Sequence, residues 1–189
     1  MSEILISYGT SYGHTEKVVR RMSQVLHNHG HSVSAYRADL LPPDICIGTY
    51  DACIVAGSVI SGKHQRYLLD FVRQHAGELN ATISAFISVS GSARDAPGQA
   101  RRCADSFLRD AGWRPTFIYC VAGAMAFTRY NWLLRLIMKL ISRSHGGPTD
   151  TSRDYDLTDW PALDRFTAQL AEAAPARAQH RSPDLRPVA

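Results

Sequence analysis

The chain has 189 residues, of which 45% are hydrophobic and 20% are charged, and its formal net charge is +4. These values are typical of a globular domain with a sizeable core, and they exclude an intrinsically disordered chain. The mildly basic charge suits an anionic ligand or an anionic membrane surface, but it is too weak to indicate binding to nucleic acid.

Short apolar runs alternate with segments of helical periodicity along most of the chain. The predicted strands cover residues 4–7, 32–38, 52–56, 85–89 and 116–121, and the predicted helices cover 15–28, 66–75, 98–110 and 159–173. This order predicts an α/β fold, a doubly wound five-stranded parallel sheet with helices on both faces. We expect one domain over residues 1–173, with an insertion over residues 122–158 at or after the fifth strand, and a disordered tail over 174–189.

Cysteine usage and hydropathy point to a reducing compartment. The four cysteines form no C-x-x-C motif and show no metal-ligand spacing, and Cys53 and Cys120 lie inside apolar runs, where buried structural thiols are typical. The chain begins directly with a predicted strand rather than a signal peptide, and no apolar run approaches the ~20 residues that span a bilayer. We therefore expect a soluble or peripheral cytoplasmic protein without a metal ion.

The loop between the first strand and the first helix reads T-x-x-G-x-T. It comprises Thr10, Ser11, Tyr12, Gly13, His14 and Thr15. Backbone N–H groups at the start of a helix, together with hydroxyl donors, favour an anion, and the absence of a P-loop lysine favours a single terminal phosphate. The alternative is an ordinary strand-to-helix turn capped by Thr15. The six residues alone do not decide between these two interpretations.

Two further loops rich in glycine and serine follow the third and fourth predicted strands, over residues 58–64 and 90–94. The carboxyl ends of parallel strands share one edge of the sheet, and ligands bind there. The three loops therefore converge, which strengthens the phosphate interpretation. Lys63 and Arg94, in or next to these loops, are either anion contacts or ordinary surface residues.

The insertion contains one predicted helix over residues 132–143. Arg135, Lys139, Ser142 and Arg143 share a narrow stripe of this helix, and the rest of its circumference is leucine, isoleucine and methionine. Three interpretations remain open. The helix lies at a membrane interface, or it packs its apolar face on the sheet, or it forms one wall of an apolar substrate pocket.

No arrangement of side chains indicates hydrolytic chemistry or a metal centre. His14 and His64 lie on loops at the ligand edge, but none of the histidines shows ligand spacing. We identify no serine or cysteine nucleophile with a partner histidine, and no side chain that we would name as an acid–base catalyst.

The strand order and the three loops together resemble the flavodoxin family, which binds FMN. The resemblance implies that the first loop holds the FMN phosphate and that the second and third loops border the isoalloxazine ring. The implied cofactor contacts are Thr10, Ser11, Tyr12, Gly13, His14 and Thr15, then Ser58, Val59, Ile60, Ser61 and Gly62, then Ser88, Val89, Ser90, Gly91, Ser92, Ala93 and Arg94.

A narrower resemblance extends over residues 3–173, to the flavodoxin-like, quinone-dependent protoporphyrinogen IX dehydrogenases. It is carried by motifs such as Ala122-Gly123-Ala124, Arg129-Tyr130-Asn131-Trp132 and Gly146-Gly147-Pro148-Thr149-Asp150-Thr151, the last after a basic helix. It implies an enzyme of haem biosynthesis that oxidises protoporphyrinogen IX with FMN, passes electrons to menaquinone or ubiquinone, and lies at the inner face of the cell membrane. The implied substrate or membrane contacts are Arg129, Tyr130, Trp132, Arg135, Lys139 and Arg143.

Two other functions remain as alternatives. One is a flavodoxin-type electron carrier without an organic substrate, although such carriers are usually strongly acidic and this chain is basic. The other is an NAD(P)H-dependent quinone reductase, for which the sequence contains no nicotinamide-binding motif. The oligomeric state is not predicted.

Overall fold

The computed structural model describes residues 1–42, 45–144 and 147–174. The predicted disordered tail, apart from Ala174, lies outside the described residues. Five parallel strands form the central sheet: β1 (Glu3–Gly9), β2 (Ser32–Arg37), β3 (Ala52–Ser58), β4 (Ile83–Ser90) and β5 (Phe117–Ala122). Their order is β2-β1-β3-β4-β5, which is the flavodoxin-like order, so the predicted fold class is confirmed.

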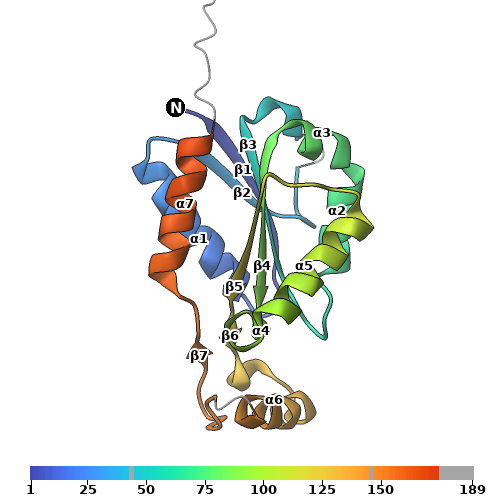
Figure 1. Cartoon of the computed structure of the whole chain (residues 1–189), viewed down its shortest axis with the longest axis vertical. Helices are drawn as coiled ribbons and strands as arrows, with labels where there is room; N and C mark the ends of the chain where they lie inside the picture. Colours follow the sequence, from blue (N-terminus) through green and yellow to red (C-terminus); the bar gives the residue numbers. More distant parts are fainter. Residues whose placement is uncertain (43–44, 145–146, 175–189) are drawn as a thin grey trace, which may run out of the picture.

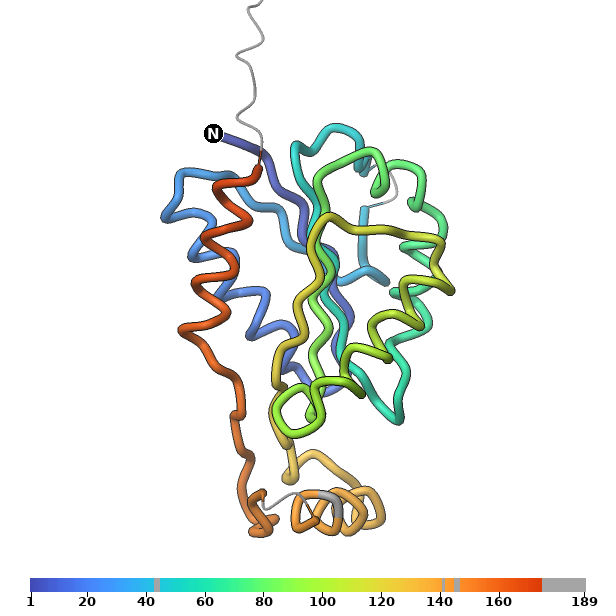
Figure 2. The backbone as a smooth tube through the Cα atoms, viewed as in Figure 1, coloured from blue at the N-terminus to red at the C-terminus, as the bar shows by residue number. Residues whose placement is uncertain are grey.

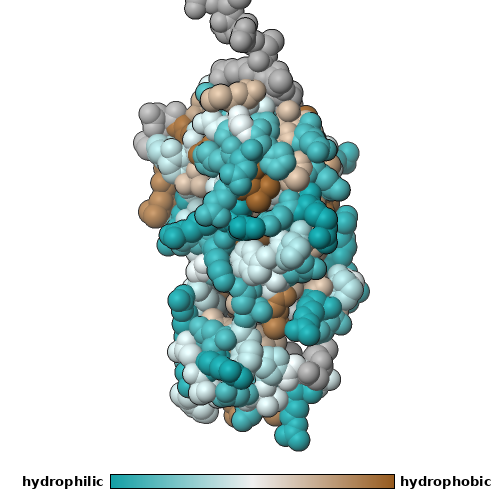
Figure 3. Space-filling view, turned by 90° about the vertical axis from the view of Figure 1, so that its left-hand side faces the viewer, coloured by the Kyte–Doolittle hydropathy of each residue, from teal (hydrophilic) through white to brown (hydrophobic). Residues whose placement is uncertain are grey.

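Helices cover both faces of the sheet (Figure 1). One face carries α1 (His14–Asn28) and α7 (Trp160–Ala173), and the other carries α2 (Arg66–Gln74), α3 (Ala76–Ala81) and α5 (Pro97–Ala111). Each helix turns one apolar stripe toward the strands, for example Val18, Met22 and Leu26 of α1, which are fully buried. The outer side formed by α1 and α7 is mainly hydrophilic (Figure 3).

Buried strands explain why the sequence shows apolar runs rather than strict alternation. In β3, the side chains of Ala52, Ile54 and Ala56 join the core beneath α1 and α7, whereas Cys53 and Val55 join the core beneath α2 and α5. A strand covered on both faces must be apolar on both. Burial also raises the pKa of the Cys53 thiol to about 12, so this thiol is inert.

Several short helices and strands were not predicted from the sequence. They are α3, the single-turn α4 (Ser92–Asp95), and the two-residue strands β6 (Ala124–Met125) and β7 (Tyr155–Asp156), which pair antiparallel within the insertion. A 3-10 helix at Ile47–Thr49 precedes β3. The third loop, expected to be irregular to residue 94, instead enters α4 at Ser92.

The insertion extends beyond the carboxyl edge of the sheet (Figure 2). Its helix α6 (Trp132–Ser144) lies across that end of the molecule, apart from the helices that cover the sheet. Large apolar side chains of α6 remain exposed, including Trp132 at 77% and Leu140 at 59%. The interpretation in which the apolar face packs on the sheet is therefore wrong. Across the described residues, no helix is both long and apolar enough to cross a membrane.

Candidate functional site

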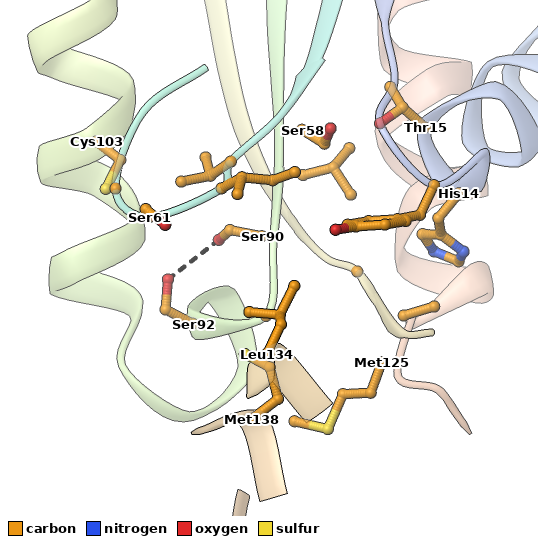
Figure 4. Close-up of a pocket in the computed structure, with 18 of the residues that line it drawn as sticks. His14, Thr15, Ser58, Ser61, Ser90, Ser92, Cys103, Met125, Leu134 and Met138 are labelled. Carbon is orange, nitrogen blue, oxygen red and sulfur yellow. Dashed lines mark hydrogen bonds between the residues drawn. The ribbon is translucent and has the colours of Figure 1, made fainter. Parts of the chain in front are cut away.

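A cavity of about 340 Å³ lies at the carboxyl edge of the sheet. It is next to β1 and β3, the two neighbouring strands between which the strand order reverses. The loops after β1, β3, β4 and β5 form its sides, and α6 closes the side away from the sheet (Figure 4). Its volume is typical of a small-molecule site, and its position is the switch point at which open α/β sheets bind ligands.

The loop after β1 is shaped by local hydrogen bonds. Gly13 adopts a left-handed conformation with φ +85°, and its N–H donates to Thr10 Oγ1 at 2.9 Å. The N–H of Thr10 donates to the hydroxyl of Tyr67 in α2 at 3.0 Å. Helix α1 then begins at His14, so the N–H groups of its first turn are directed toward the cavity end of the helix.

Thr15 does not cap α1, so the interpretation as an ordinary capped turn is wrong. The residue before the helix is Gly13, and no side chain caps the helix start. The Oγ1 atom of Thr15 is buried and has no hydrogen-bond partner in the described part of the chain, and Figure 4 shows this hydroxyl turned toward the cavity. A buried hydroxyl of this kind requires a partner, and an anion at the helix start supplies one.

The loop therefore fits the phosphate of FMN. No lysine or arginine is among the described residues that line the cavity, so neutral hydroxyls, backbone N–H groups and the helix dipole are the available donors. A triphosphate would require a lysine and a metal site. Among the described residues there is also no group of three or more histidine, cysteine, aspartate or glutamate side chains that could hold a metal ion.

The second loop contains a tight turn. Ile60 and Lys63 exchange backbone hydrogen bonds of 2.8 and 3.0 Å, and the two residues between them, Ser61 and Gly62, both have positive φ. Ser61, at φ +50°, is the one non-glycine residue with positive φ in the described part of the chain. Strain of this kind persists where the surroundings enforce it, and here it lies at the cavity rim.

The third loop is held close to β5. The N–H of Gly123 donates to the carbonyl of Ser90 at 3.0 Å, and the hydroxyls of Ser90 and Ser92 lie 3.2 Å apart (Figure 4). A Cβ atom on Gly123 would lie 3.3 Å from Val89 Cγ1, so glycine permits this close approach. The second and third loops also bond to each other, through the Val59 N–H and the Val89 carbonyl at 2.8 Å.

Gln65 links the first and second loops. Its Nε2 donates to the hydroxyl of Ser11 at 2.9 Å and to that of Ser58 at 2.5 Å. A Cβ atom on Gly9 would lie only 2.7 Å from Gln65 Oε1, so a glycine at the end of β1 leaves room for this position of the side chain. No sequence pattern singles out Gln65, because its partners lie 54 and 7 residues away.

The comparisons with known proteins agree with this geometry. A flavodoxin domain model matches residues 5–152. A relative from Escherichia coli strain K12, named protoporphyrinogen IX dehydrogenase [quinone], is 35% identical over 125 residues, which cover 65% of this chain and 69% of the relative. The chain belongs to the flavodoxin-like protoporphyrinogen IX dehydrogenase family.

A further relative and one solved structure are similar to this chain. A protein of the same name from Leishmania major is 28% identical over 174 residues, covering 88% of this chain and 74% of the relative. The solved structure of a short-chain flavodoxin associated with a non-canonical PDU bacterial microcompartment shares the fold, with a TM-score of 0.59, 14% identity, and coverage of 93% of this chain and 100% of that one. Family membership confirms the expectation of FMN as the cofactor.

Most of the predicted cofactor contacts meet at the cavity of this family member. The predicted residues that line it are Thr10, Tyr12, His14, Thr15, Ser58, Val59, Ile60, Ser61, Gly62, Val89, Ser90, Gly91 and Ser92. The predicted residues that do not line it are Ser11, Gly13, Ser88, Ala93 and Arg94. Ser11 and Ser88 instead support the loops from behind, through hydrogen bonds with Gln65 and His64.

The six residues predicted as substrate or membrane contacts separate into three groups. Tyr130 is buried and lines the cavity. Arg129 and Arg135 donate to backbone carbonyls: Arg129 to Tyr12 at 2.5 Å, and Arg135 to Phe127 and Tyr130 at 2.9 and 3.2 Å. Trp132, Lys139 and Arg143 are exposed on α6.

The predicted site residues do not include those that close the cavity, although one of the three interpretations placed the helix over residues 132–143 at the wall of a substrate pocket. From the insertion these are Gly123, Ala124, Met125, Leu134, Ile137, Met138 and Ser142, and from the region of α4 and α5 they are Asp95, Ala96, Gln99 and Cys103. Figure 4 shows Leu134, Met138 and Met125 on the side opposite Thr15 and Ser58. The helical period predicted α6, but a broad apolar arc does not indicate which part of it faces inward.

Proposed function

We propose that this protein oxidises protoporphyrinogen IX to protoporphyrin IX with FMN as cofactor and passes the electrons to a quinone. The observation that carries the proposal is one cavity with two kinds of wall. The hydroxyls of Thr10, Thr15 and Ser58 line one side, and Met125, Leu134 and Met138 line the other. The first side suits a flavin phosphate, and the second suits a large apolar macrocycle or quinone.

When bound, FMN supplies the redox chemistry, because it accepts electrons from an organic substrate and releases them to an acceptor. The residues of the chain bind and orient the cofactor and the substrate. The loops after β3 and β4 offer backbone donors and the hydroxyls of Ser61 and Ser90 at the cavity rim, and α6 supplies apolar side chains on the opposite side. His14, also on the cavity, stays neutral near pH 7, because burial lowers its pKa.

An anaerobic assay tests this proposal. The purified, FMN-loaded protein is mixed with protoporphyrinogen IX and a menaquinone analogue, and porphyrin fluorescence is recorded. We expect porphyrin to appear only when both the substrate and the quinone are present. Normal reduction of the flavin by a partner reductase, without any porphyrin formation, would instead show an electron carrier.

We also infer that α6 lies on an anionic membrane surface. Its exposed apolar residues are Trp132 at 77%, Leu133 at 51%, Leu136 at 50%, Ile137 at 44% and Leu140 at 59%. Lys139 and Arg143 are exposed on the same helix, where long basic side chains reach lipid phosphates. Because Ile137 also lines the cavity, a substrate dissolved in the bilayer would meet the site directly.

Flotation with vesicles tests this membrane proposal. Leu136→Glu and Leu140→Glu should each abolish binding to vesicles that contain phosphatidylglycerol, because a carboxylate must then enter the apolar region of the interface. Leu40→Glu is the matched control, because Leu40 is 69% exposed and lies outside the insertion. Lys139→Glu and Arg143→Glu should weaken binding to anionic vesicles. Equal flotation of all these variants and the unmodified protein would contradict the proposal.

A further inference from the structure

The loop after β1, residues 10–15, is called the phosphate loop below. In its Tyr12–Gly13 peptide unit, both the N–H and the carbonyl group make hydrogen bonds. Its N–H donates to Thr10 Oγ1 at 2.9 Å, within the loop itself. Its carbonyl, that of Tyr12, accepts a hydrogen bond from Arg129 Nη1 at 2.5 Å. Arg129 lies 117 residues further along the chain, in the insertion. The orientation of this peptide therefore depends on a residue that a simple flavodoxin-like sheet does not contain.

The side chain of Tyr12 is held by the residue next to Arg129. The rings of Tyr12 and Tyr130 meet edge to face, with centroids 5.0 Å apart and planes at 73°. Tyr130 is buried in the small apolar core of the insertion, with Met125 and Phe127, and Tyr12 packs against that core. Arg129 thus binds the backbone of Tyr12, and the adjacent Tyr130 packs against its side chain.

The last residues of the insertion, which lead from β7 to α7, contact the first turns of α1. His14 Nε2 lies 2.7 Å from Thr158 Oγ1, and the Thr158 hydroxyl donates to the Ala122 carbonyl at 2.8 Å. Lys17 Nζ lies 2.6 Å from a carboxylate oxygen of Asp156. The start of the insertion therefore contacts the phosphate loop, through Arg129 and Tyr130, and its end contacts the first residues of α1.

Arg129 acts on the loop from outside the cavity. It is not among the described residues that line the cavity, whereas Thr10, Tyr12 and Thr15 are. A Cβ atom on Gly13 would lie 3.2 Å from Arg129 Nη1, so the guanidinium packs against the outer side of the left-handed glycine. This placement does not imply a direct ion pair with the phosphate. It implies instead that Arg129 controls the conformation of the loop.

We propose that Arg129 is a positioning residue for the FMN phosphate, an inference that rests on FMN as the cofactor. By holding the Tyr12–Gly13 peptide, it keeps the first-turn N–H groups of α1 and the Thr15 hydroxyl directed at the phosphate. The insertion is then part of the cofactor site as well as a wall of the substrate site. Because coupling between two sites is reciprocal, bound FMN also stabilises the docked position of the insertion.

Comparison of FMN with riboflavin tests the inference, because riboflavin has the same ring system but no phosphate. Dissociation constants are measured by quenching of flavin fluorescence for the unmodified protein and for Arg129→Met. We expect Arg129→Met to weaken FMN binding about tenfold or more and to change riboflavin binding by less than about twofold, on the scale of one hydrogen bond near a charged group. Wild-type FMN affinity in Arg129→Met would overturn the inference.

Two controls separate positioning from charge and from folding. Arg153→Met removes a guanidinium from the same insertion whose partners are Asp150 and Tyr155 rather than the loop. Its FMN affinity should stay unchanged, and a loss equal to that of Arg129→Met would show a general charge effect and overturn the inference. Retained riboflavin binding shows that Arg129→Met is folded. If Arg129→Met lowered the affinities for FMN and riboflavin equally, the inference would also be overturned. Arg129→Gln, with a shorter neutral side chain, should behave as Arg129→Met does.

Hydrogen exchange adds a measurement that does not depend on turnover. FMN should slow exchange in residues 123–158 of the unmodified protein more than riboflavin does, and Arg129→Met should remove most of this difference. Equal protection by both flavins would overturn the reciprocal coupling. Failure of the unmodified protein to bind FMN would instead refute the proposed function, so the two failures are distinguishable.

Discussion

The imidazole of His64 lies 3.0 Å, through Nε2, from the hydroxyl of Ser88 near the carboxyl end of β4. Its ring packs against the rings of Phe86 and Phe107, which stack on each other, with centroids 5.2 and 4.9 Å away. Burial lowers the pKa of His64 from 6.5 to about 4, so this side chain is neutral at pH 7. The contact fixes the end of the second loop to the strand that leads into the third loop.

The first prediction is a loss of stability in mild acid. Between the folded pKa of about 4 and the unfolded value of 6.5, the unfolded chain binds more protons, so the free energy of unfolding falls as the pH falls through this window. The His64 share of this loss is about 2 kcal/mol between roughly pH 7 and pH 5. Urea unfolding at the two pH values measures it.

His64→Gln is the control variant for the acid effect, because glutamine can bond to Ser88 but does not titrate. Its stability should depend less on pH than that of the unmodified protein. Burial also lowers the pKa of His14, so some acid sensitivity should remain. An unchanged difference between the two pH values in His64→Gln would show that His64 does not contribute.

The second prediction concerns the buried hydroxyl of Thr15, which has no hydrogen-bond partner among the described residues. Thr15→Val keeps the shape of the side chain and removes the unsatisfied polar atom, so it should stabilise the apoprotein by about 1 kcal/mol. The same change should weaken FMN binding by about tenfold or more, because one donor to the phosphate is lost. Thermal unfolding without flavin and fluorescence titration with FMN measure the two effects. A variant that is less stable without flavin, or that binds FMN as tightly as the unmodified protein, would contradict the assignment of the Thr15 hydroxyl as a phosphate donor.

The third prediction compares two glycines. A Cβ atom on Gly57, at the end of β3, would lie 2.6 Å from Leu68 Cδ2 and 3.1 Å from His64 Cδ2. Gly57→Ala should therefore destabilise the protein by about 1–3 kcal/mol through overpacking. Gly77, in α3, has no atom within 4 Å of its Cβ position, so Gly77→Ala should be stabilising by up to about 1 kcal/mol. Urea unfolding of both variants measures the contrast, and equal shifts would refute the packing argument.

The fourth prediction concerns the inner face of α6. Leu134 and Met138 line the cavity, so Leu134→Ala and Met138→Ala should raise the KM for protoporphyrinogen IX about three- to tenfold, because apolar contact with the substrate is lost. FMN affinity should not change, since both residues lie opposite the phosphate loop (Figure 4). Leu40→Ala, at an exposed leucine outside the insertion, serves as the control. A change in FMN affinity with an unaltered KM would assign this wall to the cofactor instead.

The sheet and the loop after β1 follow from local sequence patterns. Apolar runs such as residues 52–56 are typical of strands buried on both faces, and the alternation of strands with helices implies a parallel sheet whose strand ends share one edge. Thr10, Gly13 and Thr15 could be recognised because the loop is local, with all of its informative residues within six positions. The elements α3 and α4 were missed because six- and four-residue helices show too little periodicity.

The contact between the insertion and that loop is visible only in the folded chain. The period of α6 is the same whichever arc faces inward, so the sequence does not separate Leu134 and Met138, at the cavity, from Leu136 and Leu140, which are exposed. Arg129 looks like any basic residue beside an apolar helix until the fold brings it to the Tyr12 carbonyl, 117 residues away. A contact over that distance depends on packing between separate elements, and local sequence patterns carry no record of it.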